Sequence, residues 1–135
     1  MIKFTIHGIP KPLKRHRSTR TGRMYDPSAK DKKQISLQIA QFKPKQPFAM
    51  GISLLIRFIM PRPKNHYRTG KYRHLLKDDM CFYHTFKPDL SNLIKLYEDI
   101  LQPDFYVDDS QICKIQSEKV YGEKPRTEII IEEIL

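Results

Sequence analysis

A short stretch of the sequence gathers acidic side chains around a lysine. Asp89 begins the segment "DLSNLIKLYEDIL", Lys95 follows six residues later, and Asp108 and Asp109 stand side by side soon after the segment ends. Carboxylate oxygens are the ligands that Mg²⁺ prefers in proteins. A bound Mg²⁺ activates water and stabilises the charge that develops when a phosphodiester bond is hydrolysed. These residue types therefore favour metal-assisted phosphodiester hydrolysis.

Each of these side chains also has a purely structural explanation. Asp89 follows a proline at the expected start of a helix, where aspartate often caps free backbone N–H groups. Asp108 and Asp109 precede an expected strand, and Asp-Asp-Ser is common in turns. Lys95 could be an ordinary solvated lysine, and Asp99 could pair with it across one helical turn. From these residues alone, both explanations stay open.

The charge of the chain is distributed unevenly around this acidic stretch. The formal net charge is +10, yet residues 1–77 hold 19 Lys or Arg against 2 Asp or Glu, and residues 78–135 hold 6 against 13. Dense basic clusters favour contacts with nucleic-acid phosphates over a merely solvated surface. The residues expected to contact DNA are Lys11, Lys14, Arg15, Arg17, Arg20, Arg23, Arg62, Lys64, Arg68, Lys71 and Arg73.

Two strands and one helix are expected in the N-terminal half. Apolar residues alternate through "IKFTI", which predicts a strand over residues 2–6. A basic loop over residues 10–24 follows. The sequence "DPS" at residues 26–28 indicates a helix start and predicts a helix over residues 29–42. The β-branched, alternating segment "ISLLIRFIM" at residues 52–60 predicts a central strand.

The C-terminal half begins with residues 61–88, which show no periodicity. This long basic loop suits phosphate contacts and base stacking, and a disordered insertion is the equal alternative. Apolar residues then recur at helical spacing from Leu90 to Leu101 and predict a helix. Its polar face carries Ser91, Asn92, Lys95, Glu98 and Asp99. Residues 111–121 and 126–135 flank the turn "GEKP" and predict a final antiparallel hairpin.

The expected fold is one α+β domain over residues 1–135, with a mixed or antiparallel sheet and two main helices. The order is strand, helix, strand, loop, helix, strand, strand. No apolar run approaches the roughly 18 residues of a membrane span, and the N-terminus lacks the apolar stretch of a signal peptide, so a cytoplasmic protein is expected. Cys81, His84 and Cys113 supply too few ligands for a structural zinc site, which needs four.

Three segments in order are similar to a known family. "KPDLSNLIK", "EDIL" and "DDSQI" resemble the helix start, the helix end and the Asp-Asp motif of the RusA-type Holliday junction resolvases, or RusA-like endodeoxyribonucleases. "LIRFIMPRP", "HTFKPD", "MYDP" and the basic N-terminal segment are similar as well. The remaining layout is compatible with this family over most of the chain.

The resemblance implies an endodeoxyribonuclease that resolves four-way (Holliday) DNA junctions by paired symmetric nicks, in recombination and DNA repair. It implies Mg²⁺ as the cofactor, with Mn²⁺ as a substitute, and no small-molecule cofactor. The expected partners are branched DNA and a second copy of the chain in a homodimer, with no membrane. A cytoplasmic protein encoded by a bacterium or a prophage is implied.

Roles for individual residues follow from the resemblance by position. It implies that Asp89 and Asp109 are metal-binding catalytic carboxylates, with Asp108 beside them as a further metal ligand. Lys95 falls on the lysine expected at the scissile phosphate, and Asn92 on an asparagine expected to orient the helix start. Asp99 matches the helix-end aspartate, for which a structural role is expected.

One position departs from the family pattern. The family has a second metal-binding aspartate two residues after the first, and this chain has Ser91 there. A neutral hydroxyl is a poor Mg²⁺ ligand compared with a carboxylate. Three interpretations remain: water bridges Ser91 to the metal ion, Asp108 compensates, or cutting is slow or absent. The last defines the alternative function, a non-catalytic or weakly active branched-DNA-binding protein of the same family.

Overall fold

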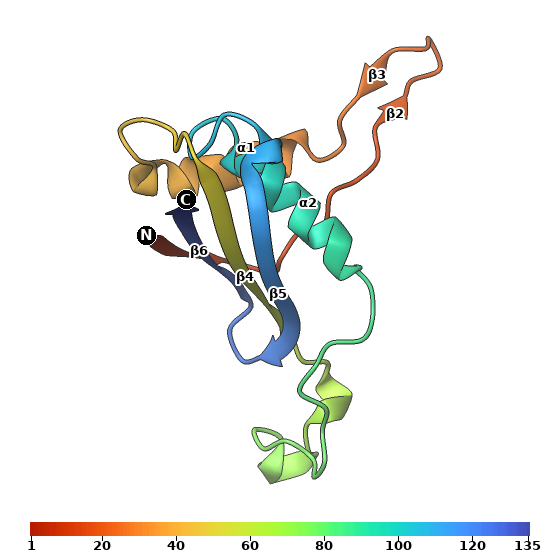
Figure 1. Cartoon of the computed structure of the whole chain (residues 1–135). Helices are drawn as coiled ribbons and strands as arrows, with labels where there is room; N and C mark the ends of the chain where they lie inside the picture. Colours follow the sequence, from red (N-terminus) through yellow and green to blue (C-terminus); the bar gives the residue numbers. More distant parts are fainter.

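The computed structural model describes all 135 residues and forms a single α+β domain, as predicted (Figure 1). One sheet contains four strands, β1 (Ile2–His7), β4 (Gly51–Pro61), β5 (Ile112–Gly122) and β6 (Arg126–Ile134). A separate pair consists of β2 (Arg17–Ser18) and β3 (Met24–Tyr25). The two helices are α1 (Ala29–Ile39), which continues as a 3₁₀ turn over Ala40–Phe42, and α2 (Leu90–Leu101).

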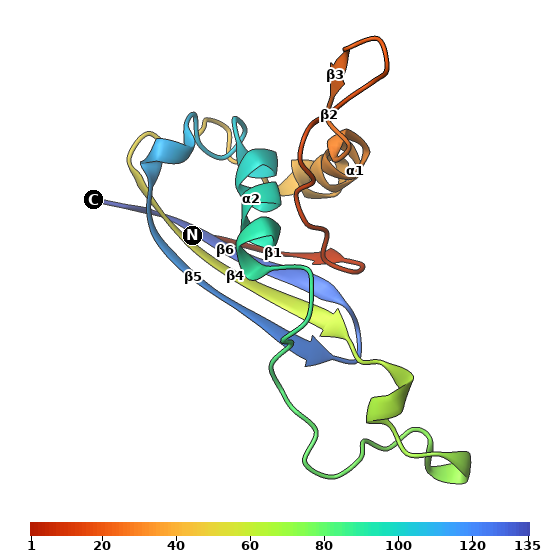
Figure 2. The ribbon, with the colours of Figure 1, turned by 90° about the vertical axis from the view of Figure 1, so that its right-hand side faces the viewer.

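Both helices lie against the same face of the four-stranded sheet (Figure 2). Strand β4 supplies alternate residues Ile52, Leu54, Ile56 and Phe58 to this face, and all four are buried. The helices contribute buried apolar residues in turn, Ile35 and Ile39 from α1 and Leu93, Leu96, Tyr97, Ile100 and Leu101 from α2. The buried face of β4, made by every second residue, and the buried face of α2, made by residues at helical spacing, therefore pack into one core. Neither helix is long or apolar enough to cross a membrane.

The sheet has the order β1-β6-β4-β5, which differs from the expected hairpin of β5 and β6. Strand β4 lies between these two, antiparallel to β6 and parallel to β5. The hairpin prediction was therefore wrong. The turn at 123–125 showed that the chain reverses, but not that the flanking strands pair. Strand β4 is buried along most of its length, and a partner on each edge satisfies its backbone hydrogen bonds.

Two basic segments extend from the body of the domain at opposite ends (Figure 1). The 10–24 segment contains β2, which pairs with β3. The 61–88 segment contains 3₁₀ turns at Lys64–His66 and Gly70–Tyr72. Its main chain also bonds to itself, since the Arg68 N–H donates to the Leu75 carbonyl at 2.8 Å. This segment therefore has local structure of its own, which the absence of periodicity did not reveal.

Candidate active site and nucleic-acid interface

Helix α2 carries the residues that match the family motif on its solvent side. Its apolar face is buried, whereas Ser91, Lys95 and Asp99 are exposed. Asn92 is half-buried, and its carbonyl accepts a hydrogen bond from the Leu13 N–H at 3.0 Å. The 10–24 basic segment is therefore attached to the first turn of α2.

Asp89 occupies the N-cap position of α2 but does not use its side chain as a cap. Its carbonyl accepts hydrogen bonds from the N–H groups of Asn92 and Leu93, each at 3.1 Å. The carboxylate makes no capping hydrogen bond and is exposed. The capping explanation for this residue is therefore not supported, and its carboxylate is free to meet a ligand.

Asp108 and Asp109 lie together at the 3₁₀ turn Asp109–Gln111. The Asp108 carboxylate accepts from the Ser110 N–H at 3.2 Å, and the Gln111 side chain accepts from the Asp108 N–H at 3.1 Å. A hydrogen bond between the two carboxyl groups lowers the pKa of Asp108 and raises the pKa of Asp109. Asp108 thus has the capping role that turn chemistry suggested.

Glu98 is close enough to Asp109 and Asp99 for their charges to affect its pKa, although the sequence gave it no functional role. It is half-buried, and burial raises its pKa, with the charges of Asp109 and Asp99 acting in the same direction. Glu98, Asp99, Asp108 and Asp109 form what we call the acidic cluster, at the C-terminal end of α2. The sequence placed Glu98 on the polar face of the helix and predicted that a short turn brings Asp108 and Asp109 back towards this helix. The structure adds that the Asp109 charge acts on Glu98.

Asp89 and the acidic cluster lie at opposite ends of α2. The helix has 12 residues, so at about 1.5 Å per residue its ends are about 18 Å apart. Mg²⁺ binds oxygen ligands at about 2.0–2.1 Å. No group of three or more His, Cys, Asp or Glu side chains in the chain is close enough to hold a metal ion. The expected set of Asp89, Asp108 and Asp109 therefore does not fit a metal site within one chain.

The two remaining charged residues of α2 have different surroundings. The Asp99 carboxylate lies 3.4 Å from the Lys32 ammonium, which lies 2.9 Å from Asp26. Asp99 therefore pairs with α1 rather than with Lys95, in agreement with a structural role. Lys95 forms no ion pair in the structure, and its charge opposes the rise in the pKa of Glu98. Its ammonium is free to meet a phosphate.

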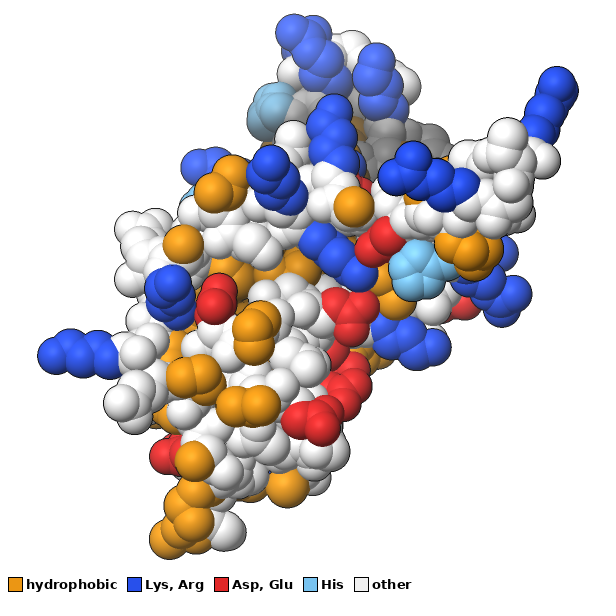
Figure 3. All heavy atoms as spheres, turned by 90° about the horizontal axis from the view of Figure 1, so that it is seen from above, with side chains coloured by type: hydrophobic (Ala, Val, Ile, Leu, Met, Phe, Trp, Pro, Cys, Tyr) orange, Lys and Arg blue, Asp and Glu red, His pale blue; other side chains and the backbone are white.

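Most of the residues predicted to contact DNA are exposed. Three have partners within the chain: Arg62 lies over the Tyr121 ring at 5.0 Å, Arg68 pairs with Asp78 at 3.2 Å, and Lys71 lies over the Tyr72 ring at 5.2 Å. Seen from above, Lys and Arg side chains lie above and to the sides of a row of acidic side chains (Figure 3). The exposed residues among those predicted to contact DNA are Lys11, Lys14, Arg15, Arg17, Arg20, Arg23, Lys64, Arg68, Lys71 and Arg73.

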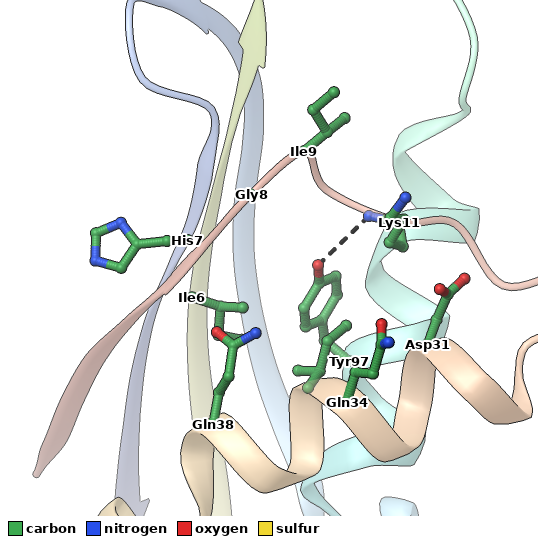
Figure 4. A pocket seen from close by; sticks show the side chains of 10 residues that line it. Ile6, His7, Gly8, Ile9, Lys11, Asp31, Gln34, Gln38 and Tyr97 are labelled. Atoms are coloured by element: carbon green, nitrogen blue, oxygen red, sulfur yellow. Dashed lines mark hydrogen bonds between the residues drawn. The ribbon is translucent and has the colours of Figure 1, made fainter.

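A cleft of about 290 Å³ lies between α1 and the chain at Gly8–Lys11 (Figure 4). Tyr97 rises into it from α2, and its hydroxyl accepts a hydrogen bond from the Lys11 N–H at 3.5 Å. None of Asp89, Asp108 and Asp109 lines this cleft. Asp89 and Lys95 instead lie exposed on the surface, which suits a large substrate better than a small molecule enclosed in a pocket.

Comparisons with known proteins agree with the motif. The family described as endodeoxyribonuclease RusA matches residues 7–132. The uncharacterized protein YqaN of Bacillus subtilis (strain 168) is 31% identical over 138 residues, which cover 98% of this chain and 96% of that protein. The crossover junction endodeoxyribonuclease rusA of Lactococcus phage r1t is 31% identical over 111 residues, 82% of this chain and 77% of that protein. The chain therefore belongs to the RusA endodeoxyribonuclease family.

Proposed function

We propose that this protein is a Mg²⁺-dependent endodeoxyribonuclease that resolves four-way DNA junctions by paired nicks. The observation that carries this proposal is the pair Asp89 and Lys95. One has an uncapped carboxylate and the other an unpaired ammonium, both exposed on the helix that bears the family motif. Family membership and the name of the phage relative support the class of reaction.

The chain's own residues would divide the work between binding and cutting. The exposed Lys and Arg side chains of the 10–24 and 61–88 segments would hold phosphates of the DNA arms, and recognition would follow shape and charge more than base sequence. Lys95 would contact the scissile phosphate. A bound Mg²⁺ would supply activation of water and stabilisation of charge at the phosphate.

The separation of the carboxylates supports a homodimer. A two-fold axis close to the middle of α2 would bring the Asp89 end of one copy beside the acidic cluster of the other. Each dimer would then have two complete sets of carboxylates. A four-way junction has two-fold symmetry and needs two nicks, which a two-fold dimer matches.

The first experiment incubates a synthetic four-way junction with the protein, in Mg²⁺ and in EDTA, and maps nicks on a denaturing gel. We expect paired, symmetric nicks that require Mg²⁺. Asp109→Asn should abolish the nicks and keep or tighten junction binding, because it removes a negative charge near the phosphate. Nicks at the wild-type rate in this variant would contradict the assignment of Asp109.

A mixing experiment tests the shared site. Asp89→Asn and Asp109→Asn are each expected to be inactive alone. In a mixed dimer with shared sites, one site carries both substitutions and the other carries neither, so a mixture should recover single nicks. If each site belongs to one chain, every site in the mixture carries a substitution. A mixture that stays inactive while heterodimers form would therefore rule out the shared site.

Ser91 favours a second candidate, a branched-DNA-binding protein that cuts weakly or not at all. Its exposed hydroxyl stands where the family pattern has a carboxylate, so this end of α2 carries one negative charge fewer than the family pattern. Tight binding of the junction by the wild-type protein without nicks in Mg²⁺ or Mn²⁺ would favour this candidate. Nicks that depend on Asp109 would exclude it.

A further inference from the structure

Lys119 holds the chain immediately before Asp89. It lies on β5, and its ammonium donates hydrogen bonds to the carbonyls of Phe86 at 2.6 Å and Pro88 at 2.7 Å. Pro88 directly precedes Asp89. A hydrogen bond from a charged donor is about twice as strong as one between neutral groups. The position of Asp89 is therefore tied to the sheet by a side chain 30 residues later in the sequence.

The backbone of Lys119 holds the same part of the chain. Strand β5 is an edge of the sheet, and residues 82–84 run along its outer side. The His84 N–H donates to the Lys119 carbonyl at 3.0 Å, and the Tyr121 N–H donates to the Phe82 carbonyl at 2.9 Å. The 61–88 segment thus returns along β5, and the Lys119 side chain then guides its last residues into α2.

The charge of Lys119 is not matched by a carboxylate. No Asp or Glu oxygen lies within 4 Å of its ammonium, although the residue is half-buried. Partial burial of a cation is unfavourable unless its donors are satisfied, and an ammonium has three of them. Two are used by main-chain carbonyls, and both of these carbonyls lie within three residues of Asp89. The charge therefore stabilises the geometry at the start of α2.

We propose that Lys119 is a positioning residue for Asp89. By fixing the carbonyls on either side of Lys87, it sets where the Asp89 carboxylate stands at the first turn of α2. This role rests on the proposed function, in which Asp89 is a catalytic carboxylate. The sequence motif does not include Lys119, and the contact appears only when β5 and the start of α2 are seen together.

The test compares Lys119→Met with a matched control, Lys114→Met. Lys114 is an exposed lysine on the same strand and makes no hydrogen bond or ion pair through its side chain. We expect Lys119→Met to lower kcat for junction nicking about 10–100-fold, as is typical for residues that orient a functional group. The KM for the junction should change much less. Lys119→Arg should recover part of the rate, and Lys114→Met should match the wild type.

Amide hydrogen exchange gives a second readout that does not depend on cutting. The N–H groups of Asn92 and Leu93 donate to the Asp89 carbonyl. Their exchange should become faster in Lys119→Met and stay unchanged in Lys114→Met, while the exchange of Leu54 in the central strand confirms that the variant is folded. If Lys119→Met does not fold, Lys119→Gln replaces it, since it keeps a donor without the charge.

The outcomes separate the two proposals. A wild-type kcat in Lys119→Met, or unchanged exchange at Asn92 and Leu93, overturns the positioning role. A fall in kcat/KM that comes entirely from a higher KM, with kcat unchanged, also overturns it, because such a change indicates weaker DNA binding. If the wild-type protein makes no nicks, the proposed function fails, and the exchange measurement alone decides whether Lys119 holds the start of α2.

Discussion

At the scale of single residues, aspartates that look alike in the sequence have different surroundings. Asp89 has a free carboxylate at a helix start, Asp108 caps a turn, and Asp99 pairs with Lys32 of α1. The neighbouring Asp108 carboxyl group raises the pKa of Asp109. These differences come from where each residue stands relative to a helix end or a turn, and they separate catalytic candidates from structural ones.

Ser91→Asp is predicted to increase the rate of junction nicking. The new carboxylate would lie two residues after Asp89, on the exposed side of the first turn of α2, where a negative charge is also favoured by the helix dipole. Nicking rates at fixed Mg²⁺ concentration measure the effect. Ser91→Asn is the control for size without charge and should stay at the wild-type rate. An unchanged rate in Ser91→Asp would show that the hydroxyl already suffices.

At the scale of elements, Lys32 joins the two helices. Its ammonium lies between Asp26, just before α1, and Asp99 in the last turn of α2. These contacts lie at the end of α2 where the acidic cluster forms. The ion pairs therefore help to hold the helix that carries both ends of the candidate site.

Asp26→Asn is predicted to weaken the dependence of thermal stability on acid pH. The hydrogen bond from Lys32, and then that from the Ser28 N–H, lower the pKa of Asp26 below its usual 3.8. The carboxylate therefore contributes stability above pH 3.8, and this contribution disappears as the pH falls through the lower value in the folded state. The melting temperature of the wild type should fall more steeply below this pH than that of the variant.

At neutral pH the same variant should melt at a lower temperature than the wild type. Asp104→Asn is a matched control, because Asp104 is exposed and forms no ion pair. Its melting curve should follow the wild type at both pH values. Equal acid dependence in Asp26→Asn and the wild type would show that the contact with Lys32 contributes nothing measurable.

At the scale of the whole molecule, the two basic segments project from opposite ends of the domain (Figure 1). Helix α2 and its carboxylates lie on the body between them. In the proposed function, branched DNA held at both segments would cross the face of α2 and would bring its backbone to Asp89 and Lys95. The basic residues of the N-terminal half are thus placed on both sides of the helix that carries the acidic residues (Figure 1).

Junction affinity is predicted to fall steeply with salt, and the β2–β3 pair should account for part of the slope. In a variant that combines Arg17→Gln, Arg20→Gln and Arg23→Gln, the slope of log affinity against log salt should decrease by about 0.9 for each phosphate that the protein no longer neutralises. Binding in EDTA over a series of NaCl concentrations measures it. A variant with Lys43→Gln and Lys45→Gln removes exposed charge outside the two segments and should keep more of the slope. Equal slopes in the two variants would contradict the role of this pair.

The sequence by itself determined the two main helices, the four strands of the main sheet and the candidate site residues, but not the β2–β3 pair or the 3₁₀ turns of the 61–88 segment. Both helices, the first strand and the central strand appear where periodicity predicted them, because each pattern reflects burial of one face of a local element. The motif around Asp89 and Asp109 identified the family, since its residues are close in sequence. The basic segments were equally visible as runs of charge.

Only the tertiary structure decided how these parts meet. It placed β4 between β5 and β6, brought the charge of Asp109 beside Glu98 at the end of α2, and brought Lys119 of β5 to the start of that helix. Each of these results depends on packing between residues far apart in the chain. Periodicity reports which face of an element is buried but not which distant element covers it, so the partners of a strand or a helix end follow only from the complete fold.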